Sequence, residues 1–180
     1  MAPKKEKIEA AAAKNLFLFY GENTFLLWTE LDRWTESFKQ KYEGDLNINI
    51  FEGENVVASE IETAMKSMPF LAEKRLTIIK NFLADAEAKE QQKIAEILGE
   101  IPDTTIAVFF EKNLPDKRTT LYRRLKEMSQ LKEFEPLMGI QLQKWTENHA
   151  IKKNVRLPSS CAAKLIDYAG GDLWMSDNEL

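Results

Sequence analysis

Leu16-Phe17-Leu18-Phe19-Tyr20 is an unbroken apolar run that is closed by Gly21. A continuous apolar run of this length is typical of a strand that is buried on both faces. Thr105-Ile106-Ala107-Val108-Phe109-Phe110 repeats the same character later in the chain. Strands of this kind belong to parallel sheets with helices on both sides, so the two runs predict an α/β fold.

Helical and strand patterns alternate around these two runs, which favours a mainly parallel sheet with helices on both faces. Apolar residues at three- and four-residue spacing mark the helices, and short β-branched or alternating runs mark the strands. The other predicted elements are a helix at 27–42 with Asn23 as its N-cap, a strand at Leu46–Phe51, a helix at Val57–Met68, a strand at Leu76–Lys80, helices around 94–98 and 121–128, and a short strand at Leu131–Phe134.

The class of pattern changes after Phe134-Glu135-Pro136, where only helical signals remain, at 140–151, 158–168 and from Asp172. We therefore predict a charged tail at 1–14, an α/β domain at 15–138, and the start of a second, helical domain at 139–180. This second part is too small to bury a core alone, and the chain stops at Leu180 within a helix just begun. We expect the sequence to be the N-terminal part of a longer protein.

The composition argues against several classes of protein. The net charge of −4 gives no overall nucleic-acid footprint. No apolar run approaches the roughly 20 residues that span a bilayer, and residues 1–14 lack the apolar core of a secretory signal. The single cysteine, Cys161, excludes an internal disulfide and fits a reducing cytoplasm, where we expect the protein to act.

The turn after the first strand, Tyr20-Gly21-Glu22-Asn23-Thr24-Phe25, is where a doubly wound sheet would hold a phosphate. A P-loop needs several glycines, then a lysine and a serine or threonine that serve the phosphates and Mg²⁺. This turn has one glycine, no lysine, and a carboxylate at Glu22 that would repel phosphate. The sequence therefore disfavours ATP hydrolysis here, and a P-loop-type ATPase with a degenerate nucleotide site remains the alternative.

Other candidates for chemistry are isolated side chains. We expect His149, the single histidine, to be partly exposed, Cys161 to be a small core residue, and Glu111 to meet solvent at the end of its strand. No HxxxH, CxxC or serine-nucleophile turn occurs. The sequence thus predicts no catalytic residue, no metal site and no cofactor.

Met68-Pro69-Phe70-Leu71 begins at the last residue of the helix predicted at 57–68 and leads toward the strand that follows it. Pro69 cannot continue the helix, because it lacks an N–H and its ring crowds the preceding turn. Phe70 and Leu71 therefore fall on a connection, where two large apolar side chains form either a lid on the local core or a protruding plug for a partner. Taken alone, the pattern favours the lid.

The segment 112–132 is locally basic. Seven positive residues against Asp116 and Glu127 give it a charge of +5: Lys112, Lys117, Arg118, Arg123, Arg124, Lys126 and Lys132. Such a segment is either a surface for DNA or an acidic partner, or a solvated helix face, and the pattern leaves both open. A DNA-binding module that uses the helix at 117–126 is thus a further alternative function.

Several short pieces, each weak alone, occur in a specific order over nearly the whole chain. They are Tyr20-Gly21-Glu22 with Leu26-Leu27, Phe51-Glu52-Gly53, Met68-Pro69-Phe70-Leu71 with Lys74-Arg75-Leu76, Lys80-Asn81, Asp116-Lys117-Arg118 with Leu121-Tyr122 and Leu125-Lys126, Phe134-Glu135-Pro136-Leu137 with Leu142 and Trp145, and Gly170-Gly171-Asp172-Leu173 with Asn178-Glu179-Leu180. In this order the chain resembles the delta subunits of the bacterial replicative clamp loader, part of the DNA polymerase III holoenzyme. Trp174 departs from the pattern, because the family often has a basic or polar residue there.

The resemblance implies an AAA+ type fold, in which a RecA-like α/β domain precedes a small helical lid that 139–180 would begin. It implies a subunit without ATP hydrolysis, in a DNA-directed DNA polymerase complex whose nucleotidyltransferase activity belongs to the holoenzyme. Phe70 and Leu71, framed by Met68 and Pro69, would insert into a hydrophobic pocket of the β sliding clamp and spring the ring open. The resemblance thus favours the plug over the lid.

The resemblance also implies a set of partners. They are the β sliding clamp, clamp-loader subunits of the gamma/tau and delta prime type, and, as a further candidate, primed DNA within the complex. Lys117, Arg118, Arg123 and Arg124 would contact this DNA or a neighbouring subunit. No membrane and no cofactor are expected.

Overall fold

The structure, a computed structural model, describes residues 15–42, 44–52 and 56–180, so the charged tail predicted at 1–14 lies outside the described residues. Strands and helices alternate as the sequence predicts. In chain order the elements are β1 (Leu16–Tyr20), α1 (Thr24–Lys41), β2 (Ile48–Glu52), α2 (Ala58–Lys66), β3 (Arg75–Lys80), α3 (Phe82–Asp85), α4 (Ala88–Ile97), the short 3₁₀ helix η1 (Leu98–Glu100), β4 (Thr105–Glu111), α5 (Thr120–Met128), β5 (Gln130–Glu133), α6 (Gly139–Lys152), α7 (Ser159–Ala169) and α8 (Leu173–Glu179).

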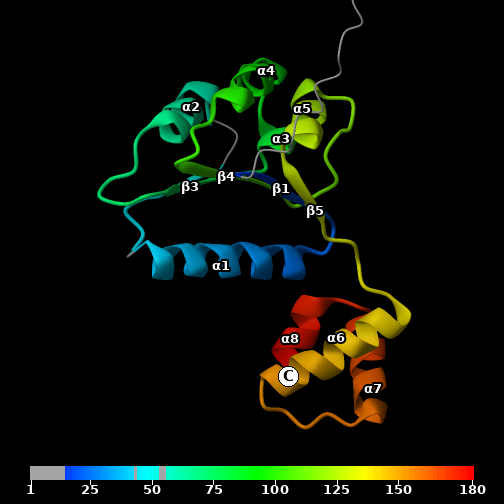
Figure 1. Cartoon of the computed structure of the whole chain (residues 1–180). Helices are drawn as coiled ribbons and strands as arrows, with labels where there is room; N and C mark the ends of the chain where they lie inside the picture. The colour runs from blue at the N-terminus through cyan, green and yellow to red at the C-terminus, as the bar shows by residue number, and fades with distance from the viewer. Residues whose placement is uncertain (1–14, 43, 53–55) are drawn as a thin grey trace, which may run out of the picture.

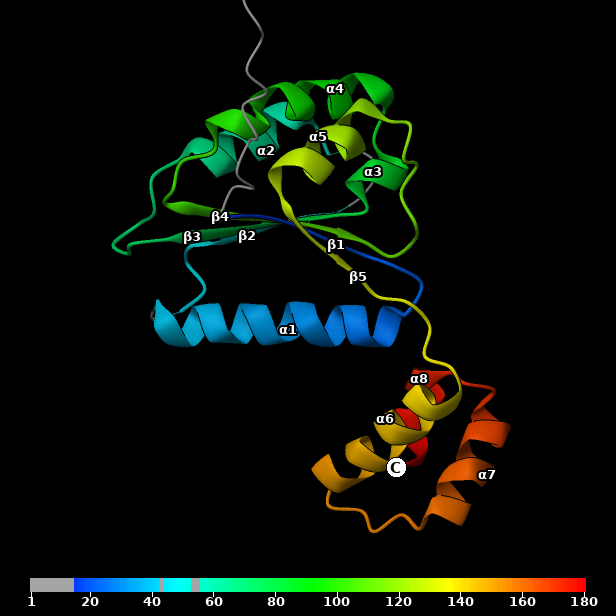
Figure 2. The same cartoon turned by 45° about the vertical axis from the view of Figure 1, so that its right-hand side comes forward.

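The strands form one sheet in the order β2-β3-β4-β1-β5, and every neighbouring pair is parallel. Helix α1 covers one face of this sheet, and α2, α4 and α5 cover the other (Figure 1; Figure 2). The predicted α/β fold with a parallel sheet between helical layers is confirmed.

Both faces of the central strands are buried, as their continuous apolar sequences predict. Leu18 and Phe109 lie in the core under α2, α4 and α5, whereas Phe19 and Phe110 lie in the core against α1. Successive side chains of a strand point to opposite faces, so each run supplies both cores in turn. The Asn23 side chain accepts a hydrogen bond from Leu26 N and caps α1, as predicted.

Two predicted boundaries are wrong near the connection between α2 and β3. Helix α2 ends at Lys66 rather than Met68, because Ser67 is extended and the position before Pro69 is disfavoured for helix. Met68, which the sequence placed on the apolar helical face, is 82% exposed. Strand β2 begins at Ile48, so Leu46 and Asn47 belong to the preceding connection.

Helices α6–α8 follow β5 and pack on the first turn of α1 through a small core of Phe25, Leu142 and Leu173. Trp174 donates from Nε1 to Thr24 Oγ1 at 2.9 Å, and its ring meets Phe25 edge-on. The division of the chain into two domains near residue 138 stays a prediction.

Two further expectations are wrong. Cys161 is exposed, and its neighbour Ala162 takes the buried position on α7, because adjacent residues of a helix lie about 100° apart. Glu111 is only 1% exposed rather than solvated. None of the described helices is long and apolar enough to cross a bilayer.

Candidate functional site

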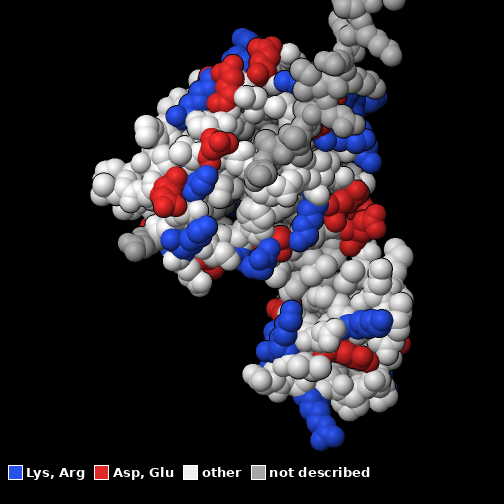
Figure 3. Space-filling model, in the orientation of Figure 1, with Lys and Arg blue, Asp and Glu red and all other residues white. Residues whose placement is uncertain are grey.

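The connection between α2 and β3 carries an exposed apolar tip, which consists of Met68, Phe70 and Leu71. Their exposed fractions are 82%, 61% and 92%. In the space-filling view (Figure 3), the end of the molecule where this connection lies is mainly white, the colour of residues other than Lys, Arg, Asp and Glu. Phe70 and Leu71 therefore do not act as a lid on the core of the protein.

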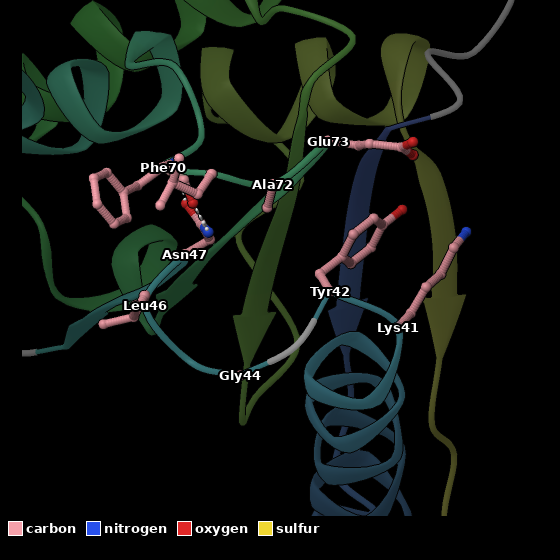
Figure 4. Close-up of a pocket in the computed structure, with 9 residues that line it drawn as sticks. Lys41, Tyr42, Gly44, Leu46, Asn47, Phe70, Ala72 and Glu73 are labelled. Atoms are coloured by element: carbon pink, nitrogen blue, oxygen red, sulfur yellow. Dashed lines mark hydrogen bonds between the residues drawn. The ribbon is translucent and has the colours of Figure 1, made fainter.

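Asn47 holds the tip from the neighbouring α1–β2 connection. Its side-chain amide donates to Phe70 O at 2.8 Å, and its Oδ1 accepts from Phe70 N at 2.6 Å. Figure 4 shows these two bonds as dashed lines between Asn47 and the backbone of Phe70. The buried amide thus pairs with both polar groups of one residue, as a neighbouring strand would.

The other side of the tip is tied to the body of the protein by two basic residues. Arg75 donates to the carbonyl oxygens of Ala64 and Met68 at 2.8 and 3.3 Å. The Lys74 ammonium donates to the carbonyl of Asp103. The loop is therefore held at both of its ends, and the apolar side chains stay outside.

Leu71 has a φ of +51°, in the left-handed region. This conformation costs a non-glycine residue about 1–2 kcal/mol, because Cβ approaches the following carbonyl oxygen. Such backbone strain persists only where surrounding contacts hold it, and it gathers at ligand clamps and similar sites. Here the contacts that hold it are those of Asn47 and Arg75.

We predict that Leu71→Gly is at least as stable as the wild type and about 1 kcal/mol more stable than Leu71→Ala. The side chain is almost fully exposed, so its loss removes little burial, and only glycine relieves the positive φ. Urea unfolding of the three proteins measures the difference. An alanine variant as stable as the glycine variant would show that Leu71 is not left-handed in solution.

Leu46 adds a fourth exposed apolar side chain close to the tip. It is 77% exposed and lines, with Phe70 and Leu71, a hollow of about 480 Å³. In Figure 4 the Leu46 side chain and the Phe70 ring project to the same side. The sequence does not single out Leu46 and Asn47, because both fit the alternating pattern of the strand that follows.

The first strand-to-helix turn is filled by the protein's own backbone. Gly21 has a φ of +141°, and a Cβ at this position would lie 2.4 Å from the carbonyl oxygen of Phe134. Asn23 N donates to the same oxygen at 3.0 Å, and the Asn23 side chain donates to Glu135 O at 3.2 Å. The chain after β5 thus lies across the turn where a phosphate would bind in a P-loop protein.

The hollow beside this turn is acidic and partly closed by aromatic rings. Glu22 and Asp172 line a space of about 240 Å³ together with Trp174. The Phe25 ring stands edge-on to Trp145 and Trp174, at centroid distances of 5.3 and 4.9 Å. Trp174 therefore packs on the first turn of α1.

Glu111 lies at the end of β4, beside α3, a helix that the sequence pattern does not predict. Its Oε1 accepts from Leu83 N at 2.9 Å. Burial raises the pKa of this carboxyl to about 8, although backbone N–H groups of α3 oppose the shift. The described residues hold no group of three His, Cys, Asp or Glu side chains placed to bind a metal ion.

The basic segment divides between two faces. Lys117, Arg118, Arg123, Arg124 and Lys126 are exposed on or just before α5, where blue atoms gather in Figure 3. Arg118 is paired with Asp116 at 2.9 Å. Lys132 instead pairs with Glu30 on the α1 side, at 2.9 Å, and Lys112 lies over the Trp28 ring.

The family model described as "DNA polymerase III, delta subunit" matches residues 17–135, which is more than half of the chain. The chain belongs to this family. The DNA polymerase III subunit delta of Bacillus subtilis (strain 168) is 23% identical over 166 residues, which cover 88% of this chain and 48% of that protein. The family resemblance read from the sequence is thus confirmed.

Solved structures show the same fold. The Bacillus subtilis DNA clamp loader delta protein matches with a TM-score of 0.68 and 22% identity over 93% of this chain and 52% of that one. A Thermotoga maritima RuvB mutant matches with a TM-score of 0.56 and 12% identity over 94% of this chain and 53% of that one. The delta-family chain therefore has an AAA+ type α/β fold and spans about half the length of the relatives it matches.

Proposed function

We propose that this delta-family chain belongs to a bacterial clamp loader, where it binds the β sliding clamp and opens it during DNA replication. The contact is the apolar tip, with Phe70 and Leu71 as the two side chains that enter a hydrophobic pocket on the clamp. The observation that carries the proposal is an outward-facing pair of large apolar residues held by hydrogen bonds, in a chain of this family.

Energetic considerations support a small hot spot at the tip. Burying side chains of this size contributes roughly 1.5–3 kcal/mol each. A loop already fixed in its bound shape loses less entropy on binding, which raises affinity. Glu73, Lys74 and Arg75 follow the tip and form a charged rim, which serves orientation and association rate more than affinity.

Opening a ring in this way needs no chemistry from the chain. It requires only that the tip bind the open or strained clamp more tightly than the closed clamp. The proposal includes that this chain does not hydrolyse ATP. Its support is the turn at Gly21, which lacks a lysine and has Phe134 O across it, and the carboxylate of Glu22 beside it.

The test is a calorimetric titration of the β clamp from the same source with the chain and with a Phe70→Ala/Leu71→Ala variant. We expect at least a hundredfold loss of affinity, the size that corresponds to about 3 kcal/mol. The melting temperature should stay near that of the wild type, because both side chains are largely exposed.

A matched control is Met138→Ala/Ile140→Ala, which removes two apolar side chains that are 74% and 63% exposed elsewhere on the surface. This control should bind the clamp like the wild type. Equal binding by the Phe70/Leu71 variant and the wild type would place the contact elsewhere and refute the proposal. Unfolding of that variant would show that the two side chains are buried in solution, contrary to the exposure described above, and would also refute the proposal.

The exposed basic residues on and just before α5 favour a second candidate, a DNA contact made by Lys117, Arg118, Arg123 and Arg124. Phosphate contacts of this kind make affinity fall steeply with salt. Salt-dependent binding of the chain to primed DNA without any clamp would support this candidate. DNA binding that is unchanged in an Arg123→Gln/Arg124→Gln variant would exclude α5 as the DNA surface.

A further inference from the structure

One residue of the α1–β2 connection, Asn47, forms hydrogen bonds with both ends of the segment from Phe70 to Leu76. The backbone carbonyl of Asn47 accepts from Leu76 N at 2.9 Å, at the start of the ladder between β2 and β3. Its side-chain amide meanwhile bonds Phe70 N and Phe70 O, at 2.6 and 2.8 Å. Asn47 thus ties Phe70 and Leu76 to one fixed point in the fold.

Asn47 itself has little freedom. Asn47 is 5% exposed, so water competes weakly for its side-chain amide. Hydrogen bonds in such a buried site are stronger than hydrogen bonds at the surface. The asparagine amide offers Phe70 an acceptor and a donor at once, whereas an ionised aspartate cannot donate to Phe70 O and alanine reaches neither atom. The strained φ of Leu71 directly follows the residue that Asn47 holds.

We propose that Asn47 is a positioning residue for clamp binding, which keeps the Phe70–Leu71 pair in its binding-competent shape without itself entering the clamp pocket. This inference rests on the proposed function. Without the two side-chain hydrogen bonds, the loop samples other conformations. The apparent affinity then equals the intrinsic affinity multiplied by the fraction of molecules whose loop is in the binding-competent shape. The same loss does not weaken the contact once it has formed.

A residue that positions the loop and a residue that contacts the clamp are expected to change the binding kinetics in different ways. A residue that sets the competent fraction changes the apparent association rate, whereas a residue buried in the interface changes mainly the dissociation rate. Asn47→Ala is therefore expected to bind the β clamp about tenfold more weakly, mainly through slower association. The Phe70→Ala/Leu71→Ala variant is expected to dissociate faster.

The experiment measures binding kinetics of the chain on immobilised clamp, together with hydrogen exchange of the Phe70 amide in the absence of clamp. Asn49→Ala is the matched control, because Asn49 is in the same strand region and its Oδ1 has no hydrogen-bond partner among the described residues. We expect Asn47→Ala to speed exchange of the Phe70 amide and to slow association, and Asn49→Ala to do neither.

Asn47→Asp is the second variant, for the case that the alanine variant fails to fold. When ionised it can still accept from Phe70 N but cannot donate to Phe70 O, so we expect slower association, measured at a temperature at which the melting curve shows the variant to be folded. Binding of the Asn47 variants that equals that of Asn49→Ala overturns the inference, as does a loss confined to the dissociation rate. If the Phe70/Leu71 variant also binds normally, the proposed function fails, whereas a loss in that variant alone overturns only the role of Asn47.

Discussion

Gly21→Ala is expected to lower the free energy of unfolding by about 4 kcal/mol, more than a typical single substitution. The φ of +141° is strained for any side chain, and the new Cβ would lie 2.4 Å from Phe134 O, a backbone atom that cannot turn aside. Relief would need β1 and the chain after β5 to separate, which would also disturb the hydrogen bond from Asn23 N to Phe134 O.

Gly44→Ala separates the two causes of this loss. Gly44 has a similar φ of +122°, but nothing lies within 4 Å of the position that a Cβ would occupy there. It therefore reports the backbone strain alone, and urea unfolding of both variants should place Gly21→Ala at least about 2 kcal/mol lower. Equal stability of the two variants would mean that Phe134 does not approach Gly21 closely in solution.

Glu111 is expected to make the protein less stable as the pH rises. The pKa of its carboxyl is about 8 in the folded protein, against an ordinary value of 4.5, because burial disfavours the charged form. The folded state therefore holds a proton that the unfolded state has lost. Its stabilising contribution is fully present below pH 4.5 and declines until about pH 8, by up to about 5 kcal/mol in total.

Glu111→Gln removes this titration and keeps an oxygen that can accept from Leu83 N. We expect the variant to gain several kcal/mol relative to the wild type between pH 5 and pH 8.5, measured by urea unfolding at a series of pH values. Glu127→Gln, on the exposed side of α5, is the control and should leave the pH profile unchanged. A wild-type profile that is flat over this range would show that Glu111 is ionised in the folded protein.

The fold could be predicted from the sequence because its main signal is local. Each central strand carries its own evidence of burial on two faces, and the helices between them repeat their apolar residues every three or four positions. The helix α3 was missed since its four residues are too few to show any period. The burial of Glu111 was missed with it, because that carboxyl lies against the backbone of α3.

The candidate site was predicted in part. Pro69 marks a helix end and leaves Phe70 and Leu71 on a connection, which local rules reveal. Whether such residues point inward or outward depends on contacts across the fold, here those of Asn47, which lies 23 positions before Phe70. No local pattern encodes that contact, and the regular alternation around Asn47 indicated an ordinary strand residue instead.

Helix α1 carries one pair of tryptophans and contacts a second pair, so fluorescence can report on two separate places in the protein. Trp28 and Trp34 lie along its sheet side, against Phe110 and Phe19, while Phe25 at its first turn meets two tryptophans of the C-terminal helices. Its 18 residues span about 27 Å, from that aromatic group to the hollow beside the tip, which Lys41 and Tyr42 line. Fluorescence from one tryptophan pair, with the other pair replaced by phenylalanine, would therefore show whether an event at the tip reaches the far end of the molecule.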